Sequence, residues 1–184
     1  MSKLRIAIFV AVVLGTVGAG VAMAGGDEHG KPFKTKRATA TLINGTGQKV
    51  GAVTIFQTRH KVTVAGRVKG LTPGFHGLHI HAVGKCEGPA FTSAGGHVAA
   101  PGQTHGGHAG DLPSLLVNAD GTASAAFETD RFTIASLRDA DGSAVMIHAG
   151  PDNFANIPAR YGTPDAETLA TGDSGARVAC GVIR

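Results

Sequence analysis

Apolar and polar side chains alternate along several short stretches of the chain. Val62, Val64, Gly66 and Val68 share one face of such a stretch, and the residues between them are polar or small. A period of two residues is typical of a β-strand with one buried face and one face in water. The pattern therefore predicts a half-buried strand over residues 61–69.

Turn sequences indicate where other strands meet. Two of them each separate a pair of strand-like stretches: Asn44–Gly47 lies between 38–43 and 50–57, and Asp120-Gly121 lies between 115–117 and 122–127. Asn-Gly and Asp-Gly favour the backbone conformation of tight β-hairpin turns. We expect a hairpin at both places and a further tight turn at Leu71–Gly74.

These short strands predict an all-β domain. No segment shows a sustained helical period, Trp is absent, and the aromatic residues are one Tyr and eight Phe, so aliphatic side chains must form the core. Antiparallel sheets packed as a sandwich or barrel suit such a pattern. Residues 82–110 and 149–176 break it because they are rich in Gly, Pro, Ala and Asp, and loops of this length are usually functional.

The N-terminal segment has the features of an export signal. Lys3 and Arg5 precede an apolar run over residues 6–21, and Ala22-Met23-Ala24 is a small-x-small cleavage site. We expect residues 1–24 to be removed as a secretory signal peptide, so that the product is exported, whether secreted, periplasmic or in the cell envelope. The alternative is an uncleaved membrane anchor facing outward, because the apolar run approaches the roughly 20 residues that span a bilayer.

The exported part is expected to consist of a flexible polar leader, residues 25–37, and one domain over residues 38–184. It contains two cysteines, Cys86 and Cys180. An oxidising compartment favours a disulfide between them over two unrelated buried thiols. Metal ligation by the pair is less favoured, because the two residues lie far apart in sequence and lack C-x-x-C spacing.

Histidines gather in the middle of the chain, where seven of the nine lie between His76 and His148. His79 and His81 are two residues apart on an expected strand, so their rings lie on the same face. His97 belongs to the first long loop, and His148 ends another apolar strand. Four imidazoles that converge from three segments suit copper(II).

A second candidate group is compact in sequence. His105, His108 and Asp111 offer two imidazoles and one carboxylate, a donor set that holds zinc when a fourth ligand is supplied. His97 is the nearest candidate for that fourth ligand.

Five motifs spread over residues 38–183 connect these candidates: Gly74–His81, Ser93–His97, Gly110–Pro113, Met146–Ala149 and Gly175–Ile183. Together with the two cysteines they resemble the copper,zinc superoxide dismutases of the bacterial secreted type. The resemblance implies an eight-stranded Greek-key β-barrel or sandwich, immunoglobulin-like, with two long functional loops. It also implies one copper and one zinc per chain, and the dismutation of superoxide to oxygen and hydrogen peroxide.

The resemblance also implies a role for each candidate ligand. The implied copper ligands are His79, His81, His97 and His148, and the implied zinc ligands are His97, His105, His108 and Asp111. His97 would bridge both metals as an imidazolate, because loss of both ring protons becomes feasible when two cations replace them. The implied mechanism is a copper redox cycle in which His97 takes up a proton and later delivers it, while zinc is structural.

The resemblance also implies roles for residues that lie around the ligands. Asp152 would accept hydrogen bonds from ligands of both metals, here His79 and His105, and so orient their rings. Arg177 would dock superoxide beside the open copper position, since a guanidinium stays charged and offers several donors to a small anion. Thr171 would line the same entrance.

Two further implied roles are structural. Cys86 and Cys180 match the intrasubunit disulfide, and His76 matches a structural histidine rather than a ligand. His29 and His60 lie outside every motif and are expected to be exposed.

The chain departs from the family pattern at the zinc loop and at the entrance. Only two glycines separate His105 from His108, where relatives have a longer loop. A copper-only dismutase with an impaired zinc site is therefore one alternative. Glu167 is present, but Ala170 replaces a lysine that many relatives carry before the position of Thr171. We therefore expect the steering of superoxide to be weaker or redistributed.

Another class of function is an exported copper-binding or buffering module on the same fold. Such a module needs neither the anion-docking Arg177 nor the bridging His97, so their presence favours the enzyme. From Lys31 to Lys85 the chain has ten Lys or Arg and no Asp or Glu. This basic region is expected to be a solvated sheet face, to steer superoxide, or to make weak contact with anionic envelope polymers. No motif supports nucleic-acid binding, and the protein is expected to be a monomer or a homodimer.

Overall fold

A computed structural model describes residues 35–59 and 61–184. The expected signal peptide, most of the expected leader, His29 and His60 lie outside these residues. Within the described part of the chain, no helix combines the length and the apolar character needed to cross a membrane.

Short β-strands dominate the described residues. They are β1 (Lys36–Asn44), β2 (Lys49–Gln57), β3 (Val62–Val68), β4 (Gly74–His76), β5 (Leu78–His81), β6 (Leu115–Val117), β7 (Ala123–Thr129), β8 (Ala144–His148) and β9 (Arg177–Val182). The helical elements found among these residues are α1 (Ala166–Thr171) and the 3-10 turns η1 (Thr92–Ala94), η2 (Ser136–Arg138) and η3 (Ala159–Tyr161). The expected all-β class is confirmed.

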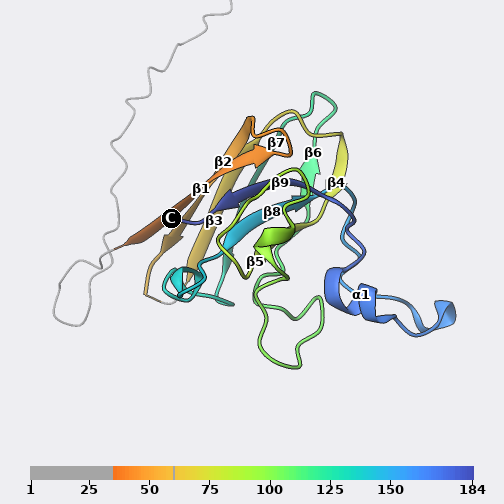
Figure 1. The fold of residues 1–184 in the computed structure, drawn as a ribbon. Helices are drawn as coiled ribbons and strands as arrows, with labels where there is room; N and C mark the ends of the chain where they lie inside the picture. Colours follow the sequence, from red (N-terminus) through yellow and green to blue (C-terminus); the bar gives the residue numbers. More distant parts are fainter. Residues whose placement is uncertain (1–34, 60) are drawn as a thin grey trace, which may run out of the picture. The chain divides into compact units, whose positions relative to one another are not determined.

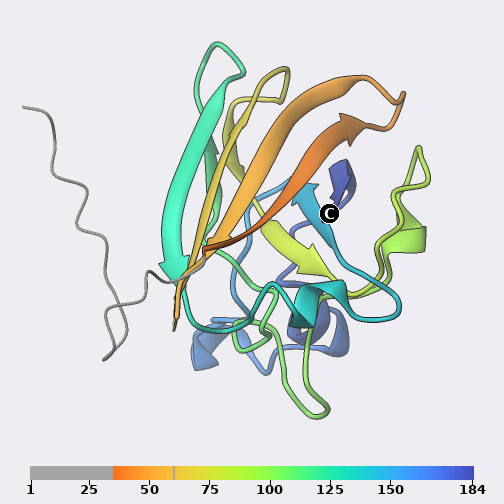
Figure 2. The same ribbon diagram turned by 90° about the vertical axis from the view of Figure 1, so that its left-hand side faces the viewer.

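Seven strands form one curled sheet in the order β5-β8-β9-β1-β2-β3-β7, and β4 pairs with β6 in a small second sheet. All of these pairings are antiparallel. β5 follows β4 after a single residue, and β6 packs beside β7, so the small sheet connects the two ends of the large one. With β4 and β5 taken as one interrupted strand, the described residues form the expected eight-stranded barrel (Figures 1 and 2).

Gly77 interrupts that strand because a side chain has no room there. A Cβ at this position would lie 2.6 Å from Cβ of Ser174 and 3.1 Å from Cε1 of His79. The Gly77 N–H donates to the carbonyl of Gly150 at 2.8 Å, and its own carbonyl accepts from the N–H of His148 at 2.9 Å. This close approach ties β4 and β5 to the beginning of the second long loop.

The core lies inside the curled sheet. Val62, Val64 and Val68 of β3 are buried and Arg67 is exposed, as the alternation predicts. The valines pack against aliphatic side chains from β1, β2, β5, β6 and β8. Burial of this apolar surface is the main source of stability for a chain that has no Trp.

The first predicted hairpin is confirmed. β1 pairs antiparallel with β2, and the side chain of Asn44 holds the turn between them. Its Oδ1 accepts hydrogen bonds from the N–H groups of Thr46 and Gln48 at 3.1 and 2.9 Å. An Asn at the start of a turn commonly acts in this way.

β1 begins at Lys36, two residues inside the segment expected to be a flexible leader. Lys36 and Arg37 lie opposite Gln57 and Phe56 in the β1–β2 ladder. The Arg37 guanidinium also lies over the Phe56 ring, 5.7 Å from its centroid. Cross-strand pairing therefore orders these two basic residues.

The second predicted hairpin is wrong in its pairing. Asp120 does form a turn, with its Oδ1 accepting from the N–H of Thr122 at 2.9 Å. However, β6 pairs with β4 and β7 pairs with β3, so the two strands that flank the turn belong to different sheets. Turn residues encode the reversal of the chain, whereas the burial of each strand decides its partner.

Cys86 and Cys180 form the expected disulfide, which links the first long loop to β9. Cys180 lies in a small buried cluster with Phe91, Ala94 and Met146, and Cys86 packs against it. The bond closes a loop across 94 residues of sequence. Cross-linking a loop of that length restricts the unfolded chain and stabilises the fold by roughly 4 to 5 kcal/mol on the chain-entropy model.

The later part of the first long loop and the second long loop lie beside each other at one end of the sheet (Figures 1 and 2). The second loop contains α1, which the sequence pattern did not predict. Asp165 caps its beginning by accepting from the N–H of Thr168 at 2.9 Å, and Gly172 ends it in the left-handed conformation. A backbone hydrogen bond of 2.7 Å from His105 to Leu169 joins the two loops.

Candidate metal centre

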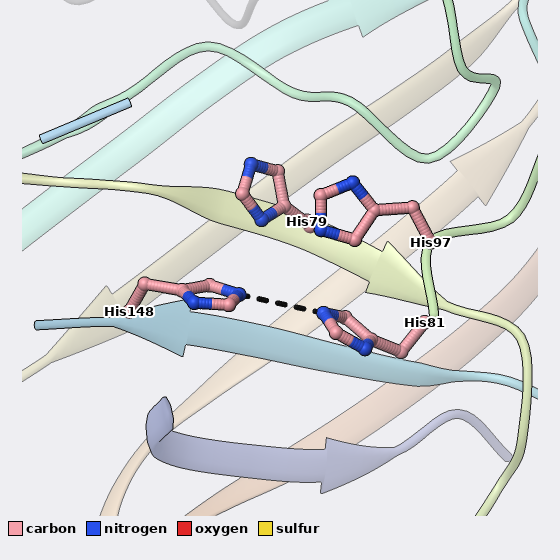
Figure 3. A group of neighbouring side chains, drawn as sticks. All are labelled: His79, His81, His97 and His148. Carbon is pink, nitrogen blue, oxygen red and sulfur yellow. Dashed lines mark hydrogen bonds between the residues drawn. The ribbon is translucent and has the colours of Figure 1, made fainter. Parts of the chain in front are cut away.

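β5 and β8 carry three of the expected copper ligands. The strands pair antiparallel, and Leu78 and Ile80 of β5 point into the core. The rings of His79 and His81 therefore lie on the opposite face, which the long loops cover. His148 ends β8 next to them (Figure 3).

Backbone hydrogen bonds bring the first long loop against β5. His97 lies opposite His81, and Asp111 lies opposite His79, as isolated antiparallel bridges. The N–H of Ile80 donates to the carbonyl of Gly110 at 2.8 Å, and the carbonyl of Ile80 accepts from the N–H of Val98 at 2.9 Å. The ring centroids of His97 and His79 are 4.0 Å apart, so the loop histidine joins the strand histidines (Figure 3).

The ring protons of His81 and His148 point away from the centre of this group. Nδ1 of His81 donates to the carbonyl of Gly95, and Nδ1 of His148 donates to that of Gly175, both at 2.9 Å. Burial lowers the pKa of His81 to about 2 and that of His148 to about 4, so both rings are neutral at neutral pH. A neutral ring has one proton, so both Nε2 atoms are bare, and they face each other at 3.4 Å.

Asp152 orients two further rings. Its Oδ2 accepts from Nε2 of His79 at 2.8 Å, and its Oδ1 accepts from Nε2 of His105 at 2.7 Å. Burial alone would raise the pKa of Asp152, but these hydrogen bonds outweigh it and hold that pKa below its ordinary value. The Nδ1 atoms of both rings therefore face inward. That of His79 is buried without a hydrogen-bond partner, and that of His105 faces the carboxylate of Asp111.

Asp111 is the centre of the second group. Its Oδ1 lies 3.0, 3.2 and 3.3 Å from the Nδ1 atoms of His97, His105 and His108. Its Oδ2 accepts from the backbone N–H groups of Gly106 and His108 at 2.7 and 2.9 Å. The two-glycine loop thus folds around one carboxylate, and all four expected zinc ligands converge there.

Two sets of ligand atoms lie within 4.8 Å of one another: His79, His81, His97 and His148, and His79, His97, His105 and Asp111. The first is the expected copper set. The second contains His79 in place of His108, but the free Nδ1 of His79 also belongs to the first set. Nδ1 of His108 lies 3.4 Å from Nδ1 of His97. His108 is therefore close to two members of the second set, His97 and Asp111, although the set within 4.8 Å does not include it.

The protonation of His97 and His105 differs. Burial lowers the pKa of His97 to about 4, so its ring is neutral at neutral pH. Burial also disfavours a charge on His105, but Asp111 and Asp152 outweigh it and raise the pKa of His105 to about 9. In the metal-free chain a proton therefore balances the two carboxylates, and a bound metal ion would displace it.

The donor atoms of both groups fit metal ions. Bare, buried imidazole nitrogens that face one another are unfavourable in the absence of a cation, because each lone pair lacks a donor. Neutral imidazoles suit copper, and imidazoles with a carboxylate suit zinc. The residues present therefore match both metals that the sequence predicts.

Arg177 lies beside the first set. The β8–β9 ladder pairs it with His148 after an irregularity in register. Its Nη1 donates to the carbonyl of Phe91 and its Nη2 to that of Gly95, both at 2.7 Å. The guanidinium is half-buried, and its charge contributes to the lowered pKa values of His81 and His148. A fixed positive charge therefore adjoins the imidazoles.

Two other residues of interest make local contacts. The Thr171 hydroxyl donates to the carbonyl of Glu167 at 2.9 Å and accepts from the N–H of Asp173 at 3.2 Å, so it helps to end α1. His76 is buried, and its ring nitrogens contact the backbone carbonyls of Thr72 and His148. These contacts agree with a structural role for His76.

Sequence reasoning missed residues that support the second group. A Cβ at Gly172 would collide with Asp152 and His105, so only glycine leaves room for their hydrogen bond. The Phe154 ring stacks on the His105 ring, with centroids 6.3 Å apart and an interplanar angle of 17°. A glycine seven residues after the cap at Asp165 indicates the end of a helix, but no sequence signal indicates the stacking of Phe154.

Comparisons with known proteins agree with this geometry. The family model described as copper/zinc superoxide dismutase (SODC) matches residues 49–183. A Cu-Zn superoxide dismutase of Mycolicibacterium paratuberculosis is 51% identical over 169 residues, which cover 83% of this chain and 70% of that protein. One of Caulobacter vibrioides is 39% identical over 160 residues, which cover 80% and 85% of the respective chains.

A solved structure is also similar. The crystal structure of a SOD-like protein from Bacillus subtilis matches with a TM-score of 0.67 and 30% sequence identity, covering 78% of this chain and 96% of that one. The family match extends over most of the barrel and includes every histidine of the two ligand sets. The chain therefore belongs to the copper/zinc superoxide dismutase family.

Proposed function

We propose that His79, His81, His97 and His148 bind copper, that His97, His105, His108 and Asp111 bind zinc, and that the chain dismutes superoxide at the copper. The observation that carries this assignment is the inward orientation of unprotonated nitrogens. The Nε2 atoms of His81 and His148 face each other, and Nδ1 of His79 has no hydrogen-bond partner. A cation between these atoms is the simplest way to satisfy them.

When bound, copper supplies the one-electron redox cycle of dismutation, and zinc supplies charge without redox chemistry. His97 supplies a proton site between the two sets. Its Nδ1 lies in the Asp111 group, so its Nε2 is the nitrogen left for the copper set. In one half of the cycle His97 would take up a proton from solvent on Nε2. In the other half it would deliver that proton to the reduced superoxide, which takes its second proton from solvent and leaves as hydrogen peroxide.

Arg177 binds the superoxide anion and orients it. Two carbonyl oxygens hold the guanidinium in place, so docking costs little side-chain entropy. Because the group stays charged at all relevant pH values, the attraction persists throughout the catalytic cycle. Arg177 thus raises the local concentration of substrate beside the copper set.

The variant His148→Ala tests the copper assignment. It removes one of the two facing Nε2 atoms, so we expect bound copper to fall sharply and dismutase activity to fall about 100-fold, with zinc content and the circular dichroism spectrum retained. Copper and zinc per chain are measured by elemental mass spectrometry, and activity is assayed on the same sample. His29→Ala is the control, because His29 belongs to none of the sequence motifs that contain the expected ligands.

Full activity of His148→Ala would contradict the assignment. In the wild-type protein, bound copper without activity would instead indicate a copper-binding module, and activity with copper alone would indicate that the short zinc loop no longer binds its metal.

The variant Arg177→Ala tests substrate docking. We expect activity to fall about tenfold and to depend less on ionic strength, because the charge that attracts superoxide is lost. Copper content should not change, and Arg177→Lys should restore part of the activity because it restores the charge. Loss of copper from the alanine variant would show that Arg177 acts by holding the copper site together.

We also propose that the chain is exported after cleavage behind Ala24. Residues 1–24 support this proposal, because a positively charged start is followed by an apolar run and then by a small-x-small cleavage site. The disulfide also supports it, because disulfides form in oxidising compartments. We expect N-terminal sequencing of the exported protein to begin at Gly25. A membrane-bound product that retains residues 1–24 would support the anchor instead.

A basic surface supports one further proposal, weak contact with anionic polymers of the cell envelope. Lys49, Arg67 and Lys69 line a hollow of about 460 Å³ where the beginning of β2 lies beside the end of β3. All three are exposed, and no Asp or Glu occurs between residues 31 and 85. A phosphate- or carboxylate-rich polymer matches this charge.

Reversal of these three charges to Glu tests the contact. We expect the wild-type protein to bind an anionic polymer column at low salt and to elute as salt rises, and the triple variant to flow through. Reversal of Lys85, Arg138 and Arg160 changes the net charge equally and serves as the control. Equal loss of binding in both triple variants would contradict a specific surface.

The oligomeric state stays a prediction of a monomer or a homodimer.

A further inference from the structure

The shortened loop between His105 and His108 has its N–H groups satisfied from inside the protein. The N–H of His105 donates to the carbonyl of Leu169 at 2.7 Å, and that of Gly107 donates to the carbonyl of Thr104 at 3.0 Å. The N–H groups of Gly106 and His108 donate to Asp111, as described above. Every backbone N–H of the four-residue loop therefore has an acceptor.

The carbonyl groups of the same loop face another partner. Nη1 of Arg131 donates to the carbonyl of His108 at 3.1 Å and to that of Gly106 at 3.4 Å. Nη2 donates to the carbonyl of Gly106 at 3.4 Å. One guanidinium thus contacts the loop on both sides of Gly107.

Arg131 reaches the loop from a fixed position. It follows β7 by two residues, and its N–H donates to Oγ1 of Thr129 at 3.2 Å. The pocket beside the loop, about 370 Å³, is lined by Arg131 together with Gly106, Asp111 and Phe154. The guanidinium therefore fastens the solvent-facing side of the loop to the barrel.

We propose that Arg131 is a positioning residue for zinc, which compensates for the shortness of the loop. Two glycines leave the backbone between His105 and His108 free to adopt many conformations, so the two rings converge only when hydrogen bonds fix the loop. Asp111 and neighbouring carbonyl groups provide such bonds from inside, and Arg131 adds them from outside. A planar guanidinium with several donors is suited to grip two carbonyl groups at once. This inference rests on the proposed zinc ligands and adds a residue whose guanidinium binds the loop through backbone carbonyl groups.

Charge does not explain the placement of Arg131. A guanidinium close to a bound cation repels it, so the contribution to zinc affinity must come from the geometry of the loop. Arg131 should consequently affect the second ligand set and leave the first set, which is built on β5 and β8, unchanged. That asymmetry separates positioning from a general effect on stability.

The test compares zinc binding by copper-loaded wild-type protein and its variants. Arg131→Ala removes the three contacts, and we expect the Kd for zinc, measured by competition with a chromophoric chelator, to rise about tenfold. Arg131→Lys keeps a donor but not the planar fork, so we expect a smaller rise. Arg138→Ala is the matched control, since Arg138 belongs to the same connection and also donates to a backbone carbonyl, that of Arg37 at 3.3 Å.

Cobalt(II) provides a second readout that does not depend on activity. Its visible absorption reports tetrahedral coordination in the second set, and we expect the spectrum of Arg131→Ala to weaken and change shape while the Kd for copper stays at the wild-type value. If the alanine variant does not fold, the lysine variant decides the question in the same assays.

Zinc binding by Arg131→Ala at the wild-type Kd would overturn the inference. So would an equal loss in the Arg138→Ala control, or a parallel loss of copper affinity, because each would indicate general destabilisation. If the wild-type protein itself binds neither zinc nor cobalt at the second set, the proposed zinc ligands are wrong and the role of Arg131 fails with them.

Discussion

The balance of protons among buried imidazoles is the constraint on which the rest of the structure depends. Each outward-facing N–H needs an acceptor, and the chain provides the carbonyls of Gly95 and Gly175 and the carboxylate of Asp152. With those acceptors in place, the inward Nε2 atoms of His81 and His148 have no protons, and the inward Nδ1 of His79 has no hydrogen-bond partner, so a cation is the partner that suits all three. If an acceptor were missing, a ring would reorient and a proton would occupy the metal position.

The barrel supplies that arrangement by combining rigid strands with irregular loops. β5 is buried on both faces, so the rings of His79 and His81 are fixed by the core packing of their neighbours. The long loops contribute His97 and His105, along with most of the acceptors. Loops alone would be too mobile for this purpose, and the disulfide between Cys86 and Cys180 together with backbone bonds to Ile80 restrains the first of them.

The sequence predicted elements whose determinants are local. Alternation located β3, and Asn44 located the first hairpin, because both depend on near neighbours. The chain reversal at Asp120 was predicted but the pairing was not, since the partners of β6 and β7 come from distant segments. The candidate ligands came from motif spacing and family resemblance. Gly172 and Arg131 could not be found this way, because each acts through a contact with a loop far away in sequence.

The carbonyl of Gly95 accepts from both His81 and Arg177. One peptide group therefore sets the angle of a proposed copper-binding ring and the position of the guanidinium that we propose receives superoxide. Any shift of that oxygen rotates the imidazole and the guanidinium together. The electronic environment of the metal and the capture of the anion are consequently not separable properties of this enzyme, and one cannot be adjusted through this loop without a change in the other.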